Sequence, residues 1–191
     1  MLFYKGSARS VAGPGDPIAC RVGALRTIPE AELTLLLAPS GSILAFALGN
    51  DVTALDLEQS NPLYQPQAKV FDGGAALGPW WTLADTAGPG ATAPFTCVVR
   101  RSGATVLEQS IDPARLVRRL EDLANWLFEA ASFPNGAVLM TGGGAAVPAD
   151  FALSRGDEVL ITHPVLGKLR NPVSPRRPSP ICPSPGPVKS S

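Results

Sequence analysis

The chain has 191 residues, of which 20 are proline and 19 are glycine, and its 16 basic side chains balance its 16 acidic ones. A net charge of zero and an isoelectric point near 6.6 leave no positive field for phosphates, which argues against a partner of nucleic acid or acidic membrane. Hydrophobic residues make up 45% of the chain, enough for one packed domain. No apolar run approaches the roughly 20 residues of a membrane-spanning helix.

The opening of the chain and its cysteines indicate a compartment. No basic stretch is followed by an apolar one at the start, so no secretion signal is expected. Cys20, Cys97 and Cys182 are widely spaced and form no Cys-x-x-Cys pair, which argues against a disulfide framework and against a zinc site. These features predict a protein of the reducing cytoplasm.

Short apolar runs alternate with turn residues along most of the chain, which is typical of a β-rich domain. The expected strands cover residues 31–37, 43–48, 95–100, 104–109, 137–140 and 157–162. The turn Arg101-Ser102-Gly103 predicts that two of them form a hairpin. Long helices do not alternate with strands, so a doubly wound dinucleotide-binding fold is not expected.

One segment has helical periodicity instead. Asp112 can cap a helix and Pro113 suits the first helical position. The apolar residues that follow lie on one stripe, at positions 116, 120, 123, 127 and 130. The pattern predicts one main amphipathic helix over about residues 113–131, before the turn at residues 133–136.

The end of the chain has a different composition. From Asn171 to Ser191, seven prolines and five serines occur among 21 residues, which disfavours both helix and sheet. Residues 174–191 are therefore expected to form a disordered tail, and residues 1–173 the folded domain.

Two acidic residues begin the first long apolar run. Glu30 and Glu32 flank Ala31, and residues i and i+2 of a strand point to the same face. Such a pair usually lies at a solvated edge, but residues 33–37 are continuously apolar, which suggests burial on both faces. Two buried anions repel one another unless a proton or a cation lies between them. The pattern therefore favours a compensated carboxylate pair.

A third carboxylate follows the next apolar run. Asp51 comes after residues 43–48 through Gly49-Asn50, where it either caps a turn or joins the pair. Three converging carboxylates are hard oxygen ligands, which suit Mg²⁺ or Mn²⁺ rather than zinc. Asp56 and Glu58 lie in a more polar stretch and are expected to face solvent.

Lys69 lies in a short apolar run, where its ammonium would be partly desolvated. Such a lysine acts as a base if it is neutral and as a clamp for a negatively charged oxygen if it is charged. An ion pair with Asp72 and a solvated position are the alternatives.

Several ordered motifs resemble the fumarylacetoacetate hydrolase family, and within it the 2-keto-3-deoxy-D-arabinonate dehydratase branch. They are PEAEL at 29–33, GNDV at 49–52, NPLYQPQAK at 61–69, FDG at 71–73, LGP at 77–79, FPNG at 133–136, LMTG at 139–142 and GKLRNPV at 167–173. The resemblance covers residues 2–173. It implies a β-rich α+β fold, a mixed β-sandwich roll of the C-terminal catalytic domain type, which is usually dimeric, so a homodimer is expected.

The resemblance also implies the site. Residues matching the family's metal ligands are Glu30, Glu32 and Asp51, which would hold Mg²⁺ (or Mn²⁺), and Lys69 would lie beside the substrate as the catalytic residue. Thr141, Gly142 and Gly143 match the substrate-binding loop. Two positions depart from the family: Leu55 stands where an arginine contacts the substrate, and Gly143 stands in place of a second threonine. Both changes are expected to weaken binding of an anionic acid, because a charged hydrogen bond contributes about 1.5–3 kcal/mol.

The activity that the resemblance implies is dehydration of a 2-keto-3-deoxy sugar acid, a 2-oxo acid, through an enolate stabilised by the metal. The alternative is hydrolysis of a C–C bond in an acylpyruvate, for which relatives recruit a histidine from an upstream lid. His163 is the only histidine, lies near the other end of the chain, and is expected to be an ordinary surface or strand-end residue. A second alternative is a truncated, non-catalytic homologue, because the family's N-terminal domain is expected to be missing.

Overall fold

A computed structural model describes residues 2–143 and 145–174 of the chain. The strands are β1 (Val11–Ala12), β2 (Ile18–Ala19), β3 (Thr27–Ile28), β4 (Ala31–Leu37), β5 (Ile43–Asp51), β6 (Thr53–Ala54), β7 (Ala75–Leu83), β8 (Phe95–Arg101), β9 (Ala104–Ile111), β10 (Ala137–Met140), β11 (Glu158–His163) and β12 (Gly167–Ser174). The helices are α1 (Leu55–Ser60), α2 (Gln65–Lys69), α3 (Ala84–Ala87) and α4 (Leu120–Ala130), with the 3-10 turns η1 (Pro62–Tyr64), η2 (Gly88–Thr92) and η3 (Pro113–Arg115). None of these helices is long and apolar enough to cross a membrane.

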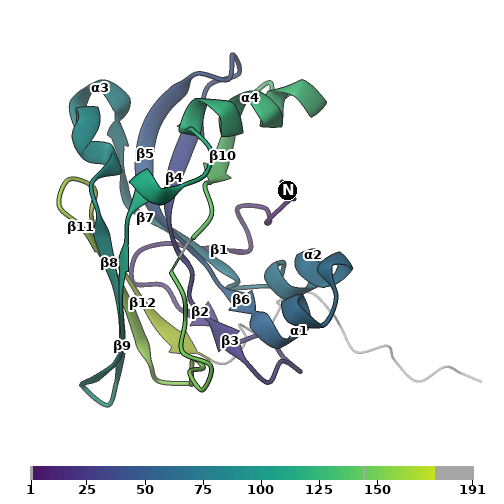
Figure 1. Ribbon diagram of the computed structural model, residues 1–191, viewed down its shortest axis with the longest axis vertical. Coiled ribbons are helices and arrows are strands. Elements are labelled where there is room, and N and C mark those ends of the chain that lie inside the picture. The colour runs from purple at the N-terminus through teal and green to yellow at the C-terminus, as the bar shows by residue number, and fades with distance from the viewer. Residues whose placement is uncertain (1, 144, 175–191) are drawn as a thin grey trace, which may run out of the picture.

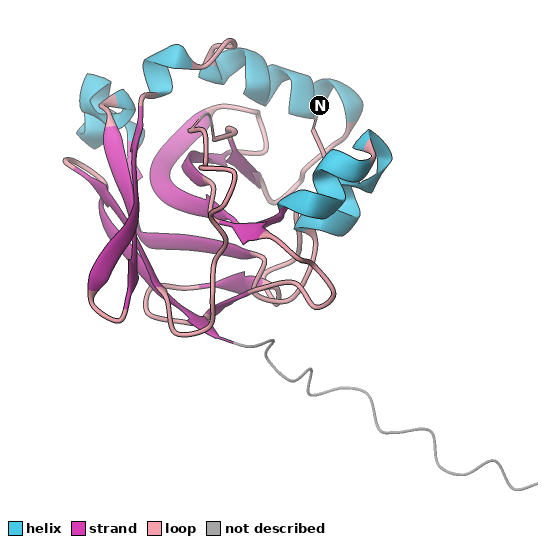
Figure 2. Cartoon of the chain, turned by 60° about the horizontal axis from the view of Figure 1, so that its bottom comes forward, coloured by secondary structure: helices cyan, strands magenta, loops and turns pink. Residues whose placement is uncertain are grey.

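In the described residues the strands form two five-stranded sheets and a small ribbon. The first sheet has the order β1-β7-β5-β4-β10, the second has the order β2-β12-β11-β8-β9, and β3 pairs with β6. β1 and β2 pair in parallel with β7 and β12, whereas the other pairs are antiparallel, so both sheets are mixed. The sheets curl into a partly open roll with helices along its rim (Figures 1 and 2). The predicted β-rich α+β roll is confirmed.

The six expected strands are all present, with β4 and β10 at the predicted bounds. The predicted hairpin is confirmed as well, because Arg101 pairs with Ala104 across a two-residue turn. Ser102 and Gly103 both have positive φ, at 50° and 85°, as this kind of tight turn requires.

Two long strands, β7 and β12, were not expected. β7 contains Gly78-Pro79, a dipeptide that is typical of a turn. The strand tolerates it because its pairing with β5 shifts register there: Leu48 pairs with Gly78 while Phe46 pairs with Thr82. A proline can lie in a sheet at such an irregularity, since no ladder hydrogen bond is required of it.

The last strand extends one residue into the stretch that the sequence predicts to be a tail. Ser174, expected in the disordered tail, is the last residue of β12 and pairs with Ala19 of β2. Its parallel pairing with β2 keeps Ser174 in the strand. Residues 175–191, the rest of the predicted tail, lie outside the described part.

The predicted helix over residues 113–131 is wrong at its start. The Asp112 side chain accepts the N–H of Ala114, but it caps only η3. Leu116 and Arg119 have extended backbone, with ψ of 129° and 152°, so α4 begins only at Leu120. The cap and the proline therefore belong to a separate turn, while the apolar stripe behaves as expected: Leu120, Leu123 and Leu127 pack against the core.

The core lies between the two sheets. Phe95, Cys97 and Val99 of β8 point inward from one sheet, and Leu33 and Leu35 of β4 point inward from the other. The alternate residues of β4 are buried too, since Glu32 is 3% exposed and Thr34 is fully buried. Burial on both faces of this strand, which its continuous apolar run predicts, is confirmed.

A buried carboxylate, Asp157, forms an ion pair with the exposed Arg101 at the end of β8. Arg101 donates to both carboxylate oxygens of Asp157, at 2.8 and 2.9 Å, and the N–H of Ser154 donates to Oδ2 at 2.8 Å. Burial opposes ionisation of Asp157, but these donors outweigh it, so the pKa of the carboxyl lies below its ordinary value.

We expect Asp157→Asn to destabilise the protein by about 2 kcal/mol at pH 7, because a charge-assisted hydrogen-bond network is lost. A depressed pKa means that the stabilisation is present above the pKa of the unfolded state and is lost as the pH falls through the folded value. Urea unfolding at pH 7 and near pH 3 checks this. The difference between the two proteins should shrink at the lower pH, and a difference that grows there would contradict the account.

Candidate metal centre

Two antiparallel strands bring the predicted carboxylates together. Glu30 and Glu32 lie on either side of the first residue of β4, and Asp51 is the last residue of β5. The register pairs Glu32 with Gly49, which places Glu30 opposite Asp51. The Asp51 N–H donates to the carbonyl of Glu30 at 2.8 Å, and the Asn50 side chain accepts the N–H of Glu30 at 3.2 Å. These bonds fix the backbone that carries the three side chains.

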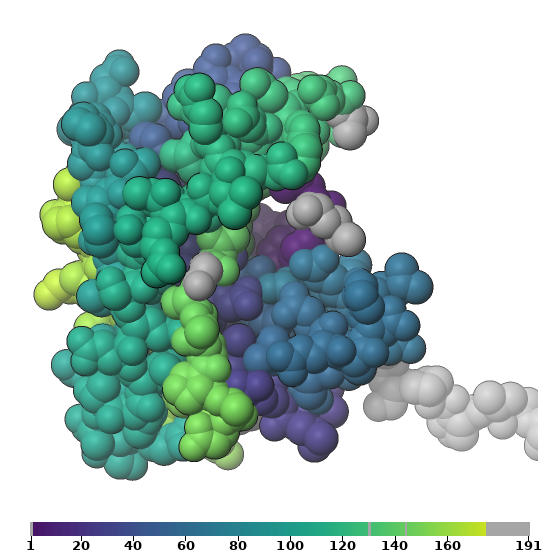
Figure 3. All heavy atoms as spheres, in the orientation of Figure 1, coloured from purple at the N-terminus to yellow at the C-terminus, as the bar shows by residue number. Residues whose placement is uncertain are grey.

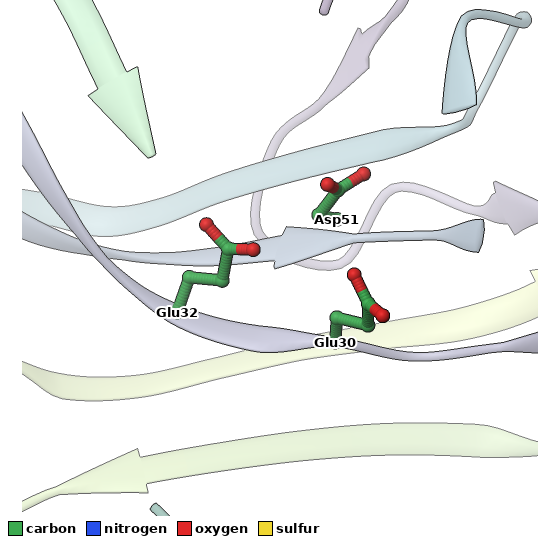
Figure 4. Close-up of side chains that lie close together, drawn as sticks. All are labelled: Glu30, Glu32 and Asp51. Carbon is green, nitrogen blue, oxygen red and sulfur yellow. The ribbon is translucent and has the colours of Figure 1, made fainter. Parts of the chain in front are cut away.

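We call Glu30, Glu32 and Asp51 the acidic cluster. One carboxylate oxygen from each residue lies within 4.8 Å of the others, and Figure 4 shows the three side chains facing a common space. Glu32 and Asp51 are buried, at 3% and 5% exposure, whereas Glu30 is partly exposed. The sequence predicts a three-carboxylate site only if Asp51 lies close to Glu30 and Glu32, and in the structure it does.

Burial and mutual repulsion make ionisation of the acidic cluster costly. Burial and then the charge of Asp51 raise the pKa of Glu32 to about 8, although the N–H of Gly142 donates to its Oε2 at 2.9 Å. Burial also raises the pKa of Glu30, against the attraction of Lys69. Such a cluster needs positive charge to hold all three carboxylates ionised.

Lys69, the last residue of α2, supplies one such charge. Its Nζ donates to Glu30 Oε2 at 2.6 Å, to Asp51 Oδ2 at 3.0 Å and to Thr53 Oγ1 at 2.8 Å. Burial would lower the pKa of Lys69, but the carboxylates of Asp51 and Glu30 outweigh it and raise the pKa above its ordinary value. Lys69 therefore pairs with the acidic cluster rather than with Asp72, and it is charged.

Two further charged residues, Lys5 and Glu58, lie at the acidic cluster, although the sequence did not predict them there. Lys5 Nζ lies 2.7 Å from Asp51 Oδ1, and its burial lowers its pKa. Glu58, expected to face solvent, is only 25% exposed and lies 3.6 Å from Lys69 Nζ, because α1 packs beside α2. The one signal for Lys5 is its position after the apolar residues 2–4, which indicates partial burial.

Asp56 also departs from its expected exposure to solvent. Its carboxylate accepts the N–H groups of Leu25 and Arg26, at 2.9 and 3.2 Å. These donors outweigh burial and lower the pKa of Asp56. The residue therefore ties the start of α1 to the segment before β3, and it takes no part in the acidic cluster.

The predicted substrate loop follows β10, which pairs with β4, and so borders the cluster. Gly142 contacts Glu32 through its N–H, while the Thr141 hydroxyl donates to the carbonyl of Leu33 at 2.9 Å. A side chain at Gly143 would come within 3.3 Å of the Ala31 carbonyl oxygen and 3.4 Å of Glu30 Cβ. The loop therefore reaches the carboxylates through its backbone, and its contact with a substrate stays a prediction.

His163 lies apart from the acidic cluster, in the second sheet. It ends β11, as expected of a strand-end residue, but it is not at the surface, since it is 2% exposed. Its Nδ1 accepts the N–H groups of Val165 and Leu166, both at 3.0 Å, and its ring packs against Phe95. Burial lowers the pKa of His163, so the ring is neutral at pH 7.

The donor set of the acidic cluster fits a hard divalent cation. All three side chains offer carboxylate oxygens, and the cluster contains neither a histidine nor a cysteine. Oxygen donors of this kind suit Mg²⁺ and Mn²⁺. A recess between the α1–α2 surface and the α4–β10 surface is visible in Figure 3, with the N-terminal segment at its floor.

Comparison with known proteins decides the family. Residues 1–174 match the model of the fumarylacetoacetate (FAA) hydrolase C-terminal domain. The chain belongs to the fumarylacetoacetate hydrolase family. The resemblance that the sequence motifs indicate is therefore confirmed.

Within this family the chain is similar to sugar-acid dehydratases. It is 34% identical over 176 residues to the 2-dehydro-3-deoxy-D-arabinonate dehydratase of Saccharolobus solfataricus, covering 92% of this chain and 59% of that protein. It is 30% identical over 173 residues to the probable 2-keto-3-deoxyxylonate dehydratase of Haloferax volcanii, covering 91% and 60%.

A solved structure of a 2-keto-3-deoxy-D-arabinonate dehydratase complexed with magnesium and 2,5-dioxopentanoate matches with a TM-score of 0.84 and 34% identity, covering 89% of this chain and 60% of that one. This family member therefore spans about three fifths of the length of the dehydratases that it matches.

Proposed function

We propose that the protein is a Mg²⁺-dependent hydro-lyase that dehydrates a 2-keto-3-deoxy sugar acid. The observation that carries the proposal is the convergence of three carboxylates within 4.8 Å beside the ammonium of Lys69. The similarity to two sugar-acid dehydratases supports the substrate class. A homodimer in the cytoplasm forms part of the proposal, and light scattering on the purified protein tests the dimer.

Glu30, Glu32 and Asp51 would hold the ion, with Mn²⁺ as an alternative to Mg²⁺. When bound, the ion would act as a Lewis acid for the keto oxygen of the substrate. The Gly142 N–H orients Glu32 toward the cluster, and Asn50 and Asp51 fix the backbone of Glu30. The chain thus holds the ligands in place by hydrogen bonds to main-chain and side-chain atoms.

Lys69 would act on the substrate's charge. Dehydration removes a proton from C3 and a hydroxyl from C4, so negative charge develops on the keto oxygen as the proton leaves. An ammonium that is held charged by Asp51 and Glu30 stabilises such charge and is a poor base. Because Lys69 is charged, its role as a clamp for a negatively charged oxygen is favoured over a role as a base.

An assay with both substrates separates dehydration from C–C hydrolysis and from a non-catalytic protein. Hydrolysis requires an activated water, and His163 is buried in the other sheet with its Nδ1 engaged by the backbone. Leu55, where relatives of the family carry a substrate-binding arginine, packs against the core, so weak binding of the acid is expected.

We expect purified protein to release water from a 2-keto-3-deoxypentonate only when Mg²⁺ or Mn²⁺ is present, and to leave an acylpyruvate intact. Product formation is followed by mass spectrometry, with EDTA-treated protein as the control. Cleavage of the acylpyruvate alone would favour the hydrolase, and no reaction with either substrate at millimolar concentration would favour the non-catalytic homologue.

A further inference from the structure

Lys5 lies among three oxygen atoms from the two chain segments that carry Asp51 and Lys69. Its Nζ is 2.7 Å from Asp51 Oδ1, and it donates to the carbonyls of Val52, at 3.4 Å, and of Lys69. Two of its three N–H donors therefore bind carbonyl oxygens, and the contact with Asp51 is an ion pair. The side chain is 15% exposed, and Nζ lies 5.6 Å from the centre of the Phe71 ring. Lys5 is therefore held in one conformation.

These contacts join two parts of the candidate metal centre. Asp51 ends β5 and Val52 follows it directly, whereas the Lys69 carbonyl lies at the end of α2, where carbonyl groups lack partners within the helix. One nitrogen atom thus ties the strand that supplies a predicted metal ligand to the helix that supplies the candidate catalytic lysine.

The two lysines also contact different oxygen atoms of the Asp51 carboxylate. Lys5 faces Oδ1 at 2.7 Å, and Lys69 faces Oδ2 at 3.0 Å. Because each oxygen has its own cationic neighbour, rotation of the carboxylate about its last bond would break one of the two contacts. The orientation of Asp51 is therefore set from both sides.

We propose that Lys5 is a positioning residue of the metal centre, which fixes the orientation of Asp51 and its separation from Lys69, and so makes the acidic cluster selective for a small divalent cation. This inference rests on the part of the proposed function that assigns a metal to the acidic cluster. Mg²⁺ requires near-ideal octahedral ligands at about 2.0–2.1 Å, whereas Ca²⁺ accepts irregular ligands at about 2.3–2.6 Å. A loosened Asp51 penalises Mg²⁺ more than Ca²⁺.

Selectivity separates positioning from two simpler roles of Lys5. A lysine that acts only through its charge repels both divalent cations alike, so its removal tightens both and leaves their ratio unchanged. A lysine that only supports the fold changes the unfolding temperature without changing that ratio.

The test is calorimetric titration of the full chain with Mg²⁺ and with Ca²⁺, in wild type, Lys5→Met and Lys5→Arg. Methionine keeps the length of the side chain without the charge. Arginine keeps the charge, but its planar group cannot place one nitrogen among three acceptors. Lys168→Met, at an exposed position of β12, is the control for net charge.

We expect the ratio of Mg²⁺ to Ca²⁺ affinity to fall by at least about tenfold in Lys5→Met and about threefold in Lys5→Arg, and to stay unchanged in Lys168→Met. If Lys5→Met does not fold, Lys5→Arg decides. An unchanged ratio in the folded variants overturns the role of Lys5 alone, whereas a wild type that binds neither cation overturns the metal centre along with it. Because no substrate is used, failure of the dehydratase assay leaves this result intact.

Discussion

Glu32→Gln is expected to lower the affinity for Mg²⁺ by at least about a hundredfold, because a neutral amide replaces a carboxylate ligand at the most buried position of the acidic cluster. The same substitution should stabilise the protein in the absence of metal. The pKa of Glu32 is raised to about 8, so its ionisation opposes folding progressively from its ordinary pKa up to that value. At pH 9, removal of the charge should raise the unfolding temperature by about 2–4 °C.

Thermal unfolding with and without Mg²⁺ checks both signs. Wild type should gain about 2.7 kcal/mol at a Mg²⁺ concentration of about one hundred times Kd, whereas the variant should gain almost nothing. The glutamine carbonyl still accepts the Gly142 N–H, so the backbone of the loop is preserved. Glu129→Gln, at an exposed position of α4, is the matched control. A variant that still responds to Mg²⁺ like wild type would show that Glu32 is no ligand.

Lys69→Met is expected to lower kcat for dehydration by at least about a hundredfold, because a charge that stabilises the developing oxyanion is removed. The substitution also removes the lysine that pairs with Glu30 at 2.6 Å and one of the two lysines that pair with Asp51, the one at 3.0 Å, while Lys5 stays beside Asp51. Loss of a partner to a buried charge costs about 3–5 kcal/mol. The metal-free variant should therefore be less stable than wild type, and Mg²⁺ should restore part of the loss.

Steady-state kinetics with calorimetry separate these effects. Mg²⁺ affinity should be retained or increased, since a neighbouring cation is gone, while kcat falls. Lys168→Met serves again as the control for a lost lysine charge. Parallel loss of Mg²⁺ binding and of activity would mean that Lys69 supports the site rather than the reaction.

Local patterns were sufficient to predict much of the fold. The continuous apolar run of β4 predicts a strand buried on both faces, and the Ser102-Gly103 turn predicts the hairpin of β8 and β9. β7 was not predicted because Gly78-Pro79 interrupts the apolar pattern of the strand. The proline is accommodated by the register shift in the pairing with β5, which is a tertiary contact. The start of α4 was misplaced because Asp112 and Pro113 give the same signal for a single 3-10 turn as for a long helix.

The carboxylates of the site could be predicted because two of them flank the first residue of one apolar strand and the third follows another apolar run. Their partners depend on tertiary contacts. Lys5 is 46 residues from Asp51, and Glu58 reaches Lys69 only because α1 and α2 pack side by side. No periodicity within either segment encodes these distances.

The measurement that tests the account most directly is calorimetric titration with oxalate, a compact mimic of a 2-oxo acid enolate, in the presence and absence of Mg²⁺. The account predicts that Mg²⁺ binds at one site per chain and that oxalate binds only to the Mg²⁺-loaded protein, with both events lost in Glu32→Gln. Oxalate binding of equal strength without Mg²⁺, or no Mg²⁺ binding by wild type, would contradict it.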